Sequence, residues 1–175
     1  MPLITVRYAT NRAQAGLKAA IAKAASDLAA GVLHKDPKVT AVLVEAADPA
    51  DWFCGGHSLA QSGLASFALD IRISDGSNNK DEKAEFIAAT SKRMGELLGP
   101  LHEESYVHVH DARADGYSFG GVTQERRYIA GNLGTRLSAA ARADGPNSGS
   151  NSRRSTASIS AGVTARPRSA RLVTP

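Results

Sequence analysis

The chain has 175 residues, of which 42% are hydrophobic and 22% charged, and this composition is typical of a globular domain with a single core. Charged residues interrupt every apolar run well short of the roughly 18 to 20 residues that a membrane span needs, so we expect no membrane insertion and a cytoplasmic location. A single cysteine, Cys54, excludes an intramolecular disulfide and a cysteine-based zinc site.

The net charge of +4 is concentrated near the C-terminus. Residues 132–175 carry +6, so residues 1–131 carry −2 and offer no basic docking face for nucleic acid. Residues 136–175 are rich in Arg and Ser and have no aromatic residue, so we predict a disordered tail that cannot bury enough surface to offset the entropy of ordering. This tail is either an arm that binds polyanions or a dispensable extension.

The first third of the chain predicts a β-α-β unit. Leu3 to Tyr8 forms a short strand, and Asn11 with Gln14 resembles a helix N-terminal cap. The helix that follows has apolar residues at spacings of three and four, at Leu17, Ala20, Ile21, Ala24, Ala25, Leu28 and Val32. Val39 to Glu45 then returns as a strand.

The following segment predicts a second unit of the same kind. Ser66 to Ser74 alternates apolar with polar residues, which indicates a strand with one buried face. Asn78 or Asn79 can cap a helix over Asp81–Leu98, and Tyr106–Asp111 makes the returning strand.

The two units are an internal repeat with an offset of 65 residues, since Phe53–Gly56 recurs as Ser118–Gly121. Right-handed crossovers make the strands within each unit parallel. We therefore predict an α/β domain over residues 2–131, with halves at about 2–56 and 65–121. It contains a four-stranded mixed sheet with two helices on one face. The other face needs a cover, so we expect self-association.

Several of these features together resemble the tautomerase superfamily, which includes 4-oxalocrotonate tautomerase, macrophage migration inhibitory factor and cis-3-chloroacrylic acid dehalogenase. They are Pro2 directly after the initiator Met, the short first strand, Arg12 opening the first helix, and the duplicated β-α-β unit with Phe53–Gly56 at the end of its first copy. The resemblance covers about residues 2–130. It implies a homotrimer.

The chemical properties of Pro2, Arg12 and Arg72 predict the reaction that a site built from them would catalyse. Removal of Met1 would leave Pro2 with a secondary amine, which is a general base when burial and nearby positive charge lower its pKa. Arg12 and Arg72 would supply that charge and bind the carboxylate of a small substrate. The prediction is a cofactor-independent isomerase that catalyses keto-enol proton transfer on a 2-oxo or 2-hydroxy-enoate acid, without a metal.

Other residues have two interpretations each. Phe53, Tyr117 and Phe119 either wall the substrate pocket or pack beside Gly-Gly turns. Arg7 serves structure or a neighbouring site, and Asp70 pairs with Arg72.

His108 and His110 lie on one strand face, which suits metal binding, but no third ligand is evident from the sequence. Cys54 is expected to be a buried thiol.

The chain differs from the dehalogenase branch at two places that bear on which reaction it would catalyse. Ala29 stands where the dehalogenase branch carries a histidine, and Ser74-Asp75 stands where it has a second arginine. These departures favour tautomerisation over water activation. A non-catalytic trimeric binding or scaffold protein of the same fold, and a hydratase- or dehalogenase-type relative, remain the alternatives.

Overall fold

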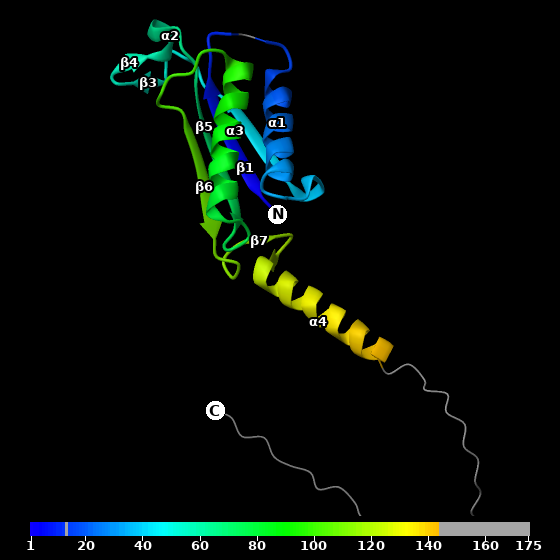
Figure 1. The fold of residues 1–175 in the computed structure, drawn as a ribbon. Coiled ribbons are helices and arrows are strands. Elements are labelled where there is room, and N and C mark those ends of the chain that lie inside the picture. Colours follow the sequence, from blue (N-terminus) through cyan, green and yellow to red (C-terminus); the bar gives the residue numbers. More distant parts are fainter. Residues whose placement is uncertain (13, 144–175) are drawn as a thin grey trace, which may run out of the picture. The chain divides into compact units, whose positions relative to one another are not determined.

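The computed structural model describes residues 1–12 and 14–143, with side chains described as far as residue 134. Figure 1 shows its elements. In chain order they are β1 (Leu3–Ala9), α1 (Leu17–Gly31), a 3-10 turn (Pro37–Val39), β2 (Ala41–Ala46), β3 (Phe53–Cys54), β4 (His57–Ser58), α2 (Leu59–Ser62), β5 (Ser66–Ser74), α3 (Lys80–Leu98), β6 (Tyr106–Ala112), β7 (Ser118–Phe119), β8 (Val122–Thr123) and α4 (Gln124–Ala143).

The main sheet has the strand order β2-β1-β5-β6, which confirms the mixed four-stranded sheet. β1 pairs in parallel with β2, and β5 pairs in parallel with β6. The two halves meet through β1 and β5, which are antiparallel, with Leu3 opposite Arg72 and Ala9 opposite Ser66. The start of β1 therefore lies beside the end of β5, and the end of β1 lies beside the start of β5.

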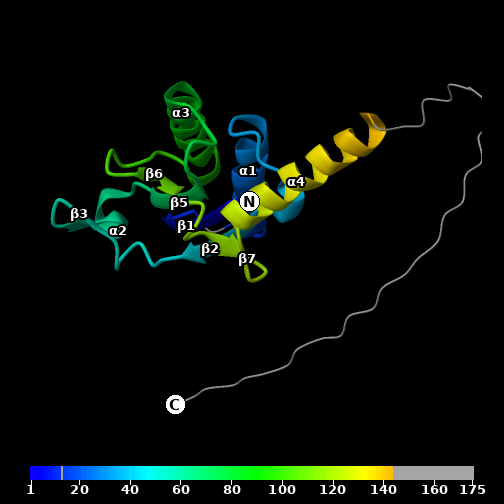
Figure 2. The ribbon, with the colours of Figure 1, turned by 90° about the horizontal axis from the view of Figure 1, so that it is seen from below.

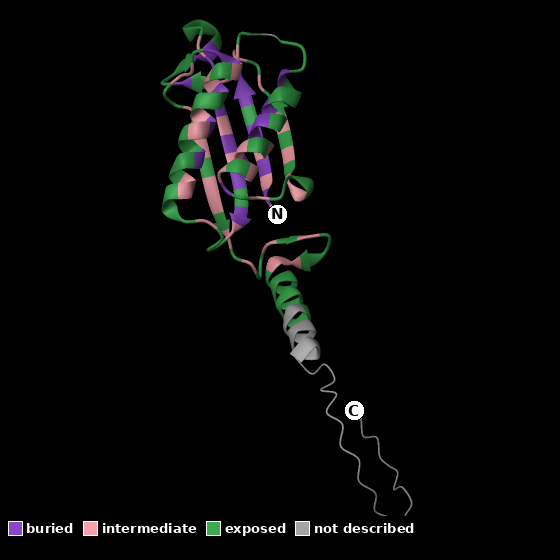
Figure 3. Cartoon of the chain, turned by 45° about the vertical axis from the view of Figure 1, so that its right-hand side comes forward, coloured by how far each residue is buried: buried purple, intermediate pink, exposed green. Residues whose placement is uncertain are grey.

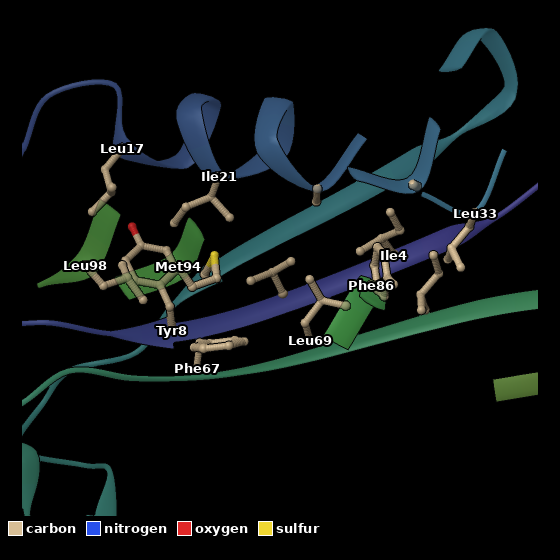
Figure 4. Packing of buried hydrophobic residues seen from close by; sticks show 14 of the residues in the cluster. Ile4, Tyr8, Leu17, Ile21, Leu33, Phe67, Leu69, Phe86, Met94 and Leu98 are labelled. Carbon is tan, nitrogen blue, oxygen red and sulfur yellow. The ribbon is translucent and has the colours of Figure 1, made fainter. Parts of the chain in front are cut away.

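The helices α1 and α3 cover the same sheet face, as Figure 2 shows. Alternation in β5 turns Phe67, Leu69, Ile71 and Ile73 towards the helices, where each is at most 1% exposed. β1 contributes Ile4, Val6 and Tyr8 to the same layer, and α1 and α3 add their apolar stripes (Figures 3 and 4). Burying each large side chain stabilises the fold by about 1.5–3 kcal/mol relative to exposure.

The predicted helix N-terminal cap is confirmed in the second half of the domain but not in the first. Asn79 caps α3 in a capping box with Glu82, as predicted for Asn78 or Asn79. The prediction of a cap at Asn11 is wrong, because α1 begins after Gly16, which has a left-handed conformation and makes no side-chain cap. The Asn11 amide donates instead to the Leu59 carbonyl oxygen at 3.2 Å.

The Gly-Gly pairs form the tight turns of two short hairpins, β3-β4 and β7-β8. Gly55 and Gly56 have φ angles of 58° and 85°, and Gly120 and Gly121 have 55° and 75°. A two-residue turn with both φ angles positive matches the twist of a hairpin and favours glycine at both positions. The sequence predicted the repeat of these motifs but not the hairpins.

The C-terminal helix α4 continues directly from β8 and ends at Ala143, so it includes part of the segment predicted as a disordered tail. Residues 144–175 of that predicted tail lie outside the described residues. Within the described part of the chain, no helix is both long and apolar enough to cross a membrane.

The sheet face opposite α1 and α3 is polar. Arg7, Arg72 and His108 are exposed on it, and Asp70 is half-exposed. We expected that face to need cover because of apolar side chains; the large apolar residues of β5 all face the helices, but Leu43 of β2 and Tyr106 of β6 are exposed on the edge strands. Its Asp70 is paired with His108 and His110 rather than with Arg72.

Candidate functional site

The antiparallel pairing of β1 with β5 separates the predicted site residues into two groups. Pro2, Arg72 and Tyr117 lie at the beginning of β1, whereas Arg12 follows the end of β1 and Phe53 lies in the hairpin after β2. The seven residues of β1 span about 23 Å at 3.3 Å per residue. Within one chain, Pro2 and Arg12 therefore do not share a site.

Pro2 is buried immediately before β1. Its carbonyl oxygen accepts a hydrogen bond from the Ala41 backbone N–H at 3.2 Å, which fixes this end of the chain to β2. The pKa of the Met1 amine is lowered, mainly by burial and further by the positive charge of Lys35, while Asp36 opposes the shift. An amine at this end of β1 thus favours its neutral form, which a general base requires.

Lys35 is a residue that no sequence pattern indicated. Lys35 lies in the turn after α1. In this turn His34 has a positive φ of 56°, and the Asn78 amide donates to the Leu33 carbonyl oxygen at 3.1 Å. Burial lowers the pKa of Lys35, with partial compensation from Glu82 and Asp111. No sequence spacing relates Lys35 to Pro2, since only the sheet topology brings them near each other.

Tyr117, which directly precedes the second hairpin, connects that segment to the N-terminus and to β5. Its hydroxyl lies 3.0 Å from the Met1 carbonyl oxygen and 3.3 Å from that of Arg72, and it can donate to either. Burial raises the pKa of Tyr117, so the phenol remains protonated as a donor at neutral pH. Tyr117 thus brings a hydroxyl group from the second half of the domain beside the N-terminus.

Arg72 differs from its counterpart in the first half. The Arg7 guanidinium is paired with Glu45, with Nε 2.7 Å from the carboxylate oxygen. Arg72 is exposed, and among the described side chains no carboxylate forms an ion pair with it. Its guanidinium is therefore available for an anionic ligand at the Pro2 end of the sheet.

The aromatic residues of the hairpins have different surroundings. Phe119 is covered by the Arg127 guanidinium, whose central carbon lies 3.7 Å from the ring centroid and whose Nη2 donates to the Phe119 carbonyl oxygen at 2.8 Å. Phe53 is 63% exposed in the first hairpin. Among the described residues of one chain, neither Phe53 nor Phe119 forms a hydrogen bond with Pro2.

Arg12 lines a pocket of about 450 Å³ at the opposite end of β1. Its other walls come from Tyr8, Thr10, Gln14, Ala15, Leu17, Ala46 and Ala47. The guanidinium rests on Gly99, where an added Cβ would lie 2.7 Å from the Arg12 Cζ. Glycine at position 99, with φ of 96°, thus provides both the turn after α3 and the space for Arg12.

Cys54 is buried, as expected, and burial raises the pKa of its thiol. It lies in a pocket of about 350 Å³ with His57, Gln61, Ser62 and His102. A thiol with a raised pKa is a poor nucleophile at neutral pH, so this pocket offers no activated cysteine.

No protein-family model and no curated protein sequence matches the chain. Its structure does resemble solved structures. Pt0534 inactivated by 2-oxo-3-pentynoate has a TM-score of 0.62 at 15% identity, covering 71% of this chain and 98% of that one. A fused 4-OT described as a symmetric trimer has a TM-score of 0.60 at 18% identity, covering 70% and 96%. A macrophage migration inhibitory factor-like protein of Entamoeba histolytica has 0.57 at 16%, covering 70% and 97%.

Proposed function

We propose, because the chain has the fold of the tautomerase superfamily, that it is a cofactor-independent isomerase in which Pro2 is the general base. The observation that carries this proposal is the environment of the N-terminus. Pro2 is buried immediately before β1, and both burial and Lys35 lower the pKa of the Met1 amine, one residue before it. The substrate class is a small 2-oxo acid or its enol, such as phenylenolpyruvate or 2-hydroxymuconate.

The reaction needs only one proton to move between two atoms of the substrate. After removal of Met1, the Pro2 nitrogen takes the proton from the enol hydroxyl, and the enolate carbon then takes a proton from the resulting ammonium. The C=C bond becomes a single bond and the C–O bond becomes a carbonyl. The enzyme returns to its starting state, so the reaction requires no oxidant, metal or cofactor.

Tyr117 gains a role when Met1 is removed. Its hydroxyl would lose the Met1 carbonyl oxygen as an acceptor and keep that of Arg72. A protonated phenol beside the base can donate a hydrogen bond to the substrate oxygen on which negative charge develops. Arg72 and Lys35 supply positive charge for the carboxylate at the same end of the sheet.

Arg12 can join such a site only from another subunit, because about 23 Å of β1 separates it from Pro2 within one chain. We therefore propose a homotrimer, because the similar fused 4-OT structure is a symmetric trimer. Apolar side chains available for burial include Leu43 and Tyr106 on the edge strands and Tyr128, Ile129 and Leu133 on α4.

Light scattering of the full-length protein is expected to give three times the chain mass of 18.3 kDa. Closed cyclic association would bury exposed apolar surface in every subunit at once. A well-folded monomer at low micromolar concentration would contradict both the trimer and the participation of Arg12.

The dependence of activity on pH tests the environment of the base. Lys35→Gln removes a positive charge that disfavours the ammonium form, so the pKa of the Pro2 amine should rise and the acidic limb of kcat/KM should move to higher pH. Asp36→Asn should move that limb in the opposite direction, because Asp36 favours the ammonium form.

These two variants are matched controls for each other. Asn is as good a helix N-cap as Asp, so Asp36→Asn should keep the hydrogen bond from the Lys38 N–H that starts the 3-10 turn. Shifts in the same direction for both variants, or no shift in either, would mean that the base is not at the N-terminus.

Hydrolytic chemistry has less support than tautomerisation. Ala29, which stands where the dehalogenase branch carries a histidine, is fully buried on the core-facing side of α1 and offers no polar group. A non-catalytic scaffold of the same fold predicts no turnover with any enol acid even when Met1 has been removed.

A further inference from the structure

The polar face of the main sheet brings together Asp70 of β5 with His108 and His110 of the edge strand β6. Asp70 lies on β5 directly opposite His108 on β6, and His110 follows two residues later on the same face. The His110 Nε2 lies 3.2 Å from the Asp70 Oδ1, and the His108 Nδ1 lies 3.7 Å from the same oxygen. The two imidazole rings have centroids 3.7 Å apart with a tilt of 33°.

The spacing of the three donor atoms matches a cation-binding site. A tetrahedral zinc ion binds imidazole nitrogen and carboxylate oxygen at about 2.0–2.2 Å, which places two ligands roughly 3.3–3.5 Å apart. One donor atom from each of the three residues lies within 4.8 Å of the others, so an ion could be held with small side-chain rotations. These residue types, imidazole with a carboxylate, are the ligands that zinc and copper prefer.

The three side chains are also partly exposed to solvent, as a cation-binding site with water ligands requires. The side chains of Asp70, His108 and His110 are 46%, 63% and 38% exposed, so water can complete the coordination shell. Rigid neighbouring strands hold all three, and the β5-β6 register sets their separation without a loop.

We propose that Asp70, His108 and His110 form a binding site for a borderline divalent cation, with Zn²⁺ as the reference ion and at least one coordination position open. Sequence reasoning found the two histidines but no third ligand, because Asp70 lies 40 positions before His110 and only strand pairing places them together. In the sheet register Asp70 is opposite Thr5 rather than Pro2. The site is therefore separate from the proposed general base, although His110 is opposite Arg72 in the register of β5 and β6. Binding of a cation there does not depend on the proposed isomerase function.

Calorimetric titration of the full-length, chelator-treated protein with ZnCl₂ tests this site, with Co²⁺ absorption as a second readout of the ligand geometry. Wild-type protein should bind one ion per chain and give the visible spectrum of tetrahedral Co²⁺. His108→Ala, His110→Ala and Asp70→Asn should each weaken Zn²⁺ binding at least about tenfold, and the double histidine variant should lose it.

The matched control is His57→Ala with His102→Ala, which removes two histidines from the pocket near Cys54 and leaves the sheet unchanged. This control should bind Zn²⁺ like the wild type. Circular dichroism and light scattering should show every variant folded and in the wild-type oligomeric state. The proposal is overturned if wild-type protein binds no Zn²⁺ under these conditions, or if the double variant of His108 and His110 binds as well as the wild type.

Discussion

Pro2→Ala is expected to lower kcat/KM for an enol acid by roughly 10²- to 10⁴-fold, the usual contribution of a general base. Alanine, like proline, permits removal of Met1, but it lacks the ring that fixes the position of the nitrogen and makes it a secondary amine. The Pro2 carbonyl oxygen accepts from Ala41, and the backbone carbonyl of the substituted alanine can make the same bond, so the sheet should remain intact.

A second comparison isolates the nitrogen without any substitution. Protein that retains Met1 has an amide at Pro2, with no lone pair available to accept a proton. Treatment with methionine aminopeptidase should convert this inactive form into active enzyme, with the loss of Met1 followed by intact mass. Wild-type rates for Pro2→Ala, or for the methionyl form, would exclude Pro2 as the base.

Arg72→Ala is expected to raise KM for a carboxylate substrate roughly ten- to a hundredfold, because loss of a charge-assisted hydrogen-bonded pair costs about 1.5–3 kcal/mol. The Tyr117 hydroxyl interacts with the backbone carbonyl of Arg72, so the substitution leaves that acceptor in place. The change should therefore act on substrate binding rather than on the position of Tyr117.

Arg7→Ala is the matched control for this prediction. Arg7 occupies the equivalent position in the first half, on the same sheet face, but its guanidinium is already paired with Glu45. It should change KM little. A neutral ester of the same substrate should be affected less by Arg72→Ala than the acid is. Equal losses for the acid and the ester would show that Arg72 does not bind the carboxylate.

The β-α-β units followed from local patterns because each pattern reflects one face of one element. The alternation from Phe67 to Ile73 identified β5 with its observed bounds, and the three-and-four spacing from Leu17 identified α1. The prediction at Asn11 failed because its amide hydrogen-bonds to Leu59, a residue 48 positions away.

The candidate site was only partly predictable. Pro2 and Arg72 lie at the same end of the sheet because β1 and β5 are antiparallel, whereas the same pairing separates Arg12 from them. Lys35 had no signal in the sequence, since its effect on the N-terminal amine depends on the turn after α1. Tyr117 was predicted as a pocket wall, but its hydrogen bonds to the carbonyl oxygens of Met1 and Arg72 required the chain to return to this end of the sheet after β6.

The sequence by itself determined the repeat, the helices and strands of the two β-α-β units and the apolar layer, because hydrophobic periodicity acts over a few residues. Only the tertiary structure decided which polar side chains meet. The ion pair of Arg7 with Glu45 and the cluster of Asp70 with His108 and His110 join residues about 40 positions apart. Such contacts depend on strand order, direction and register, which arise from packing of the whole sheet against α1 and α3 and not from any local pattern.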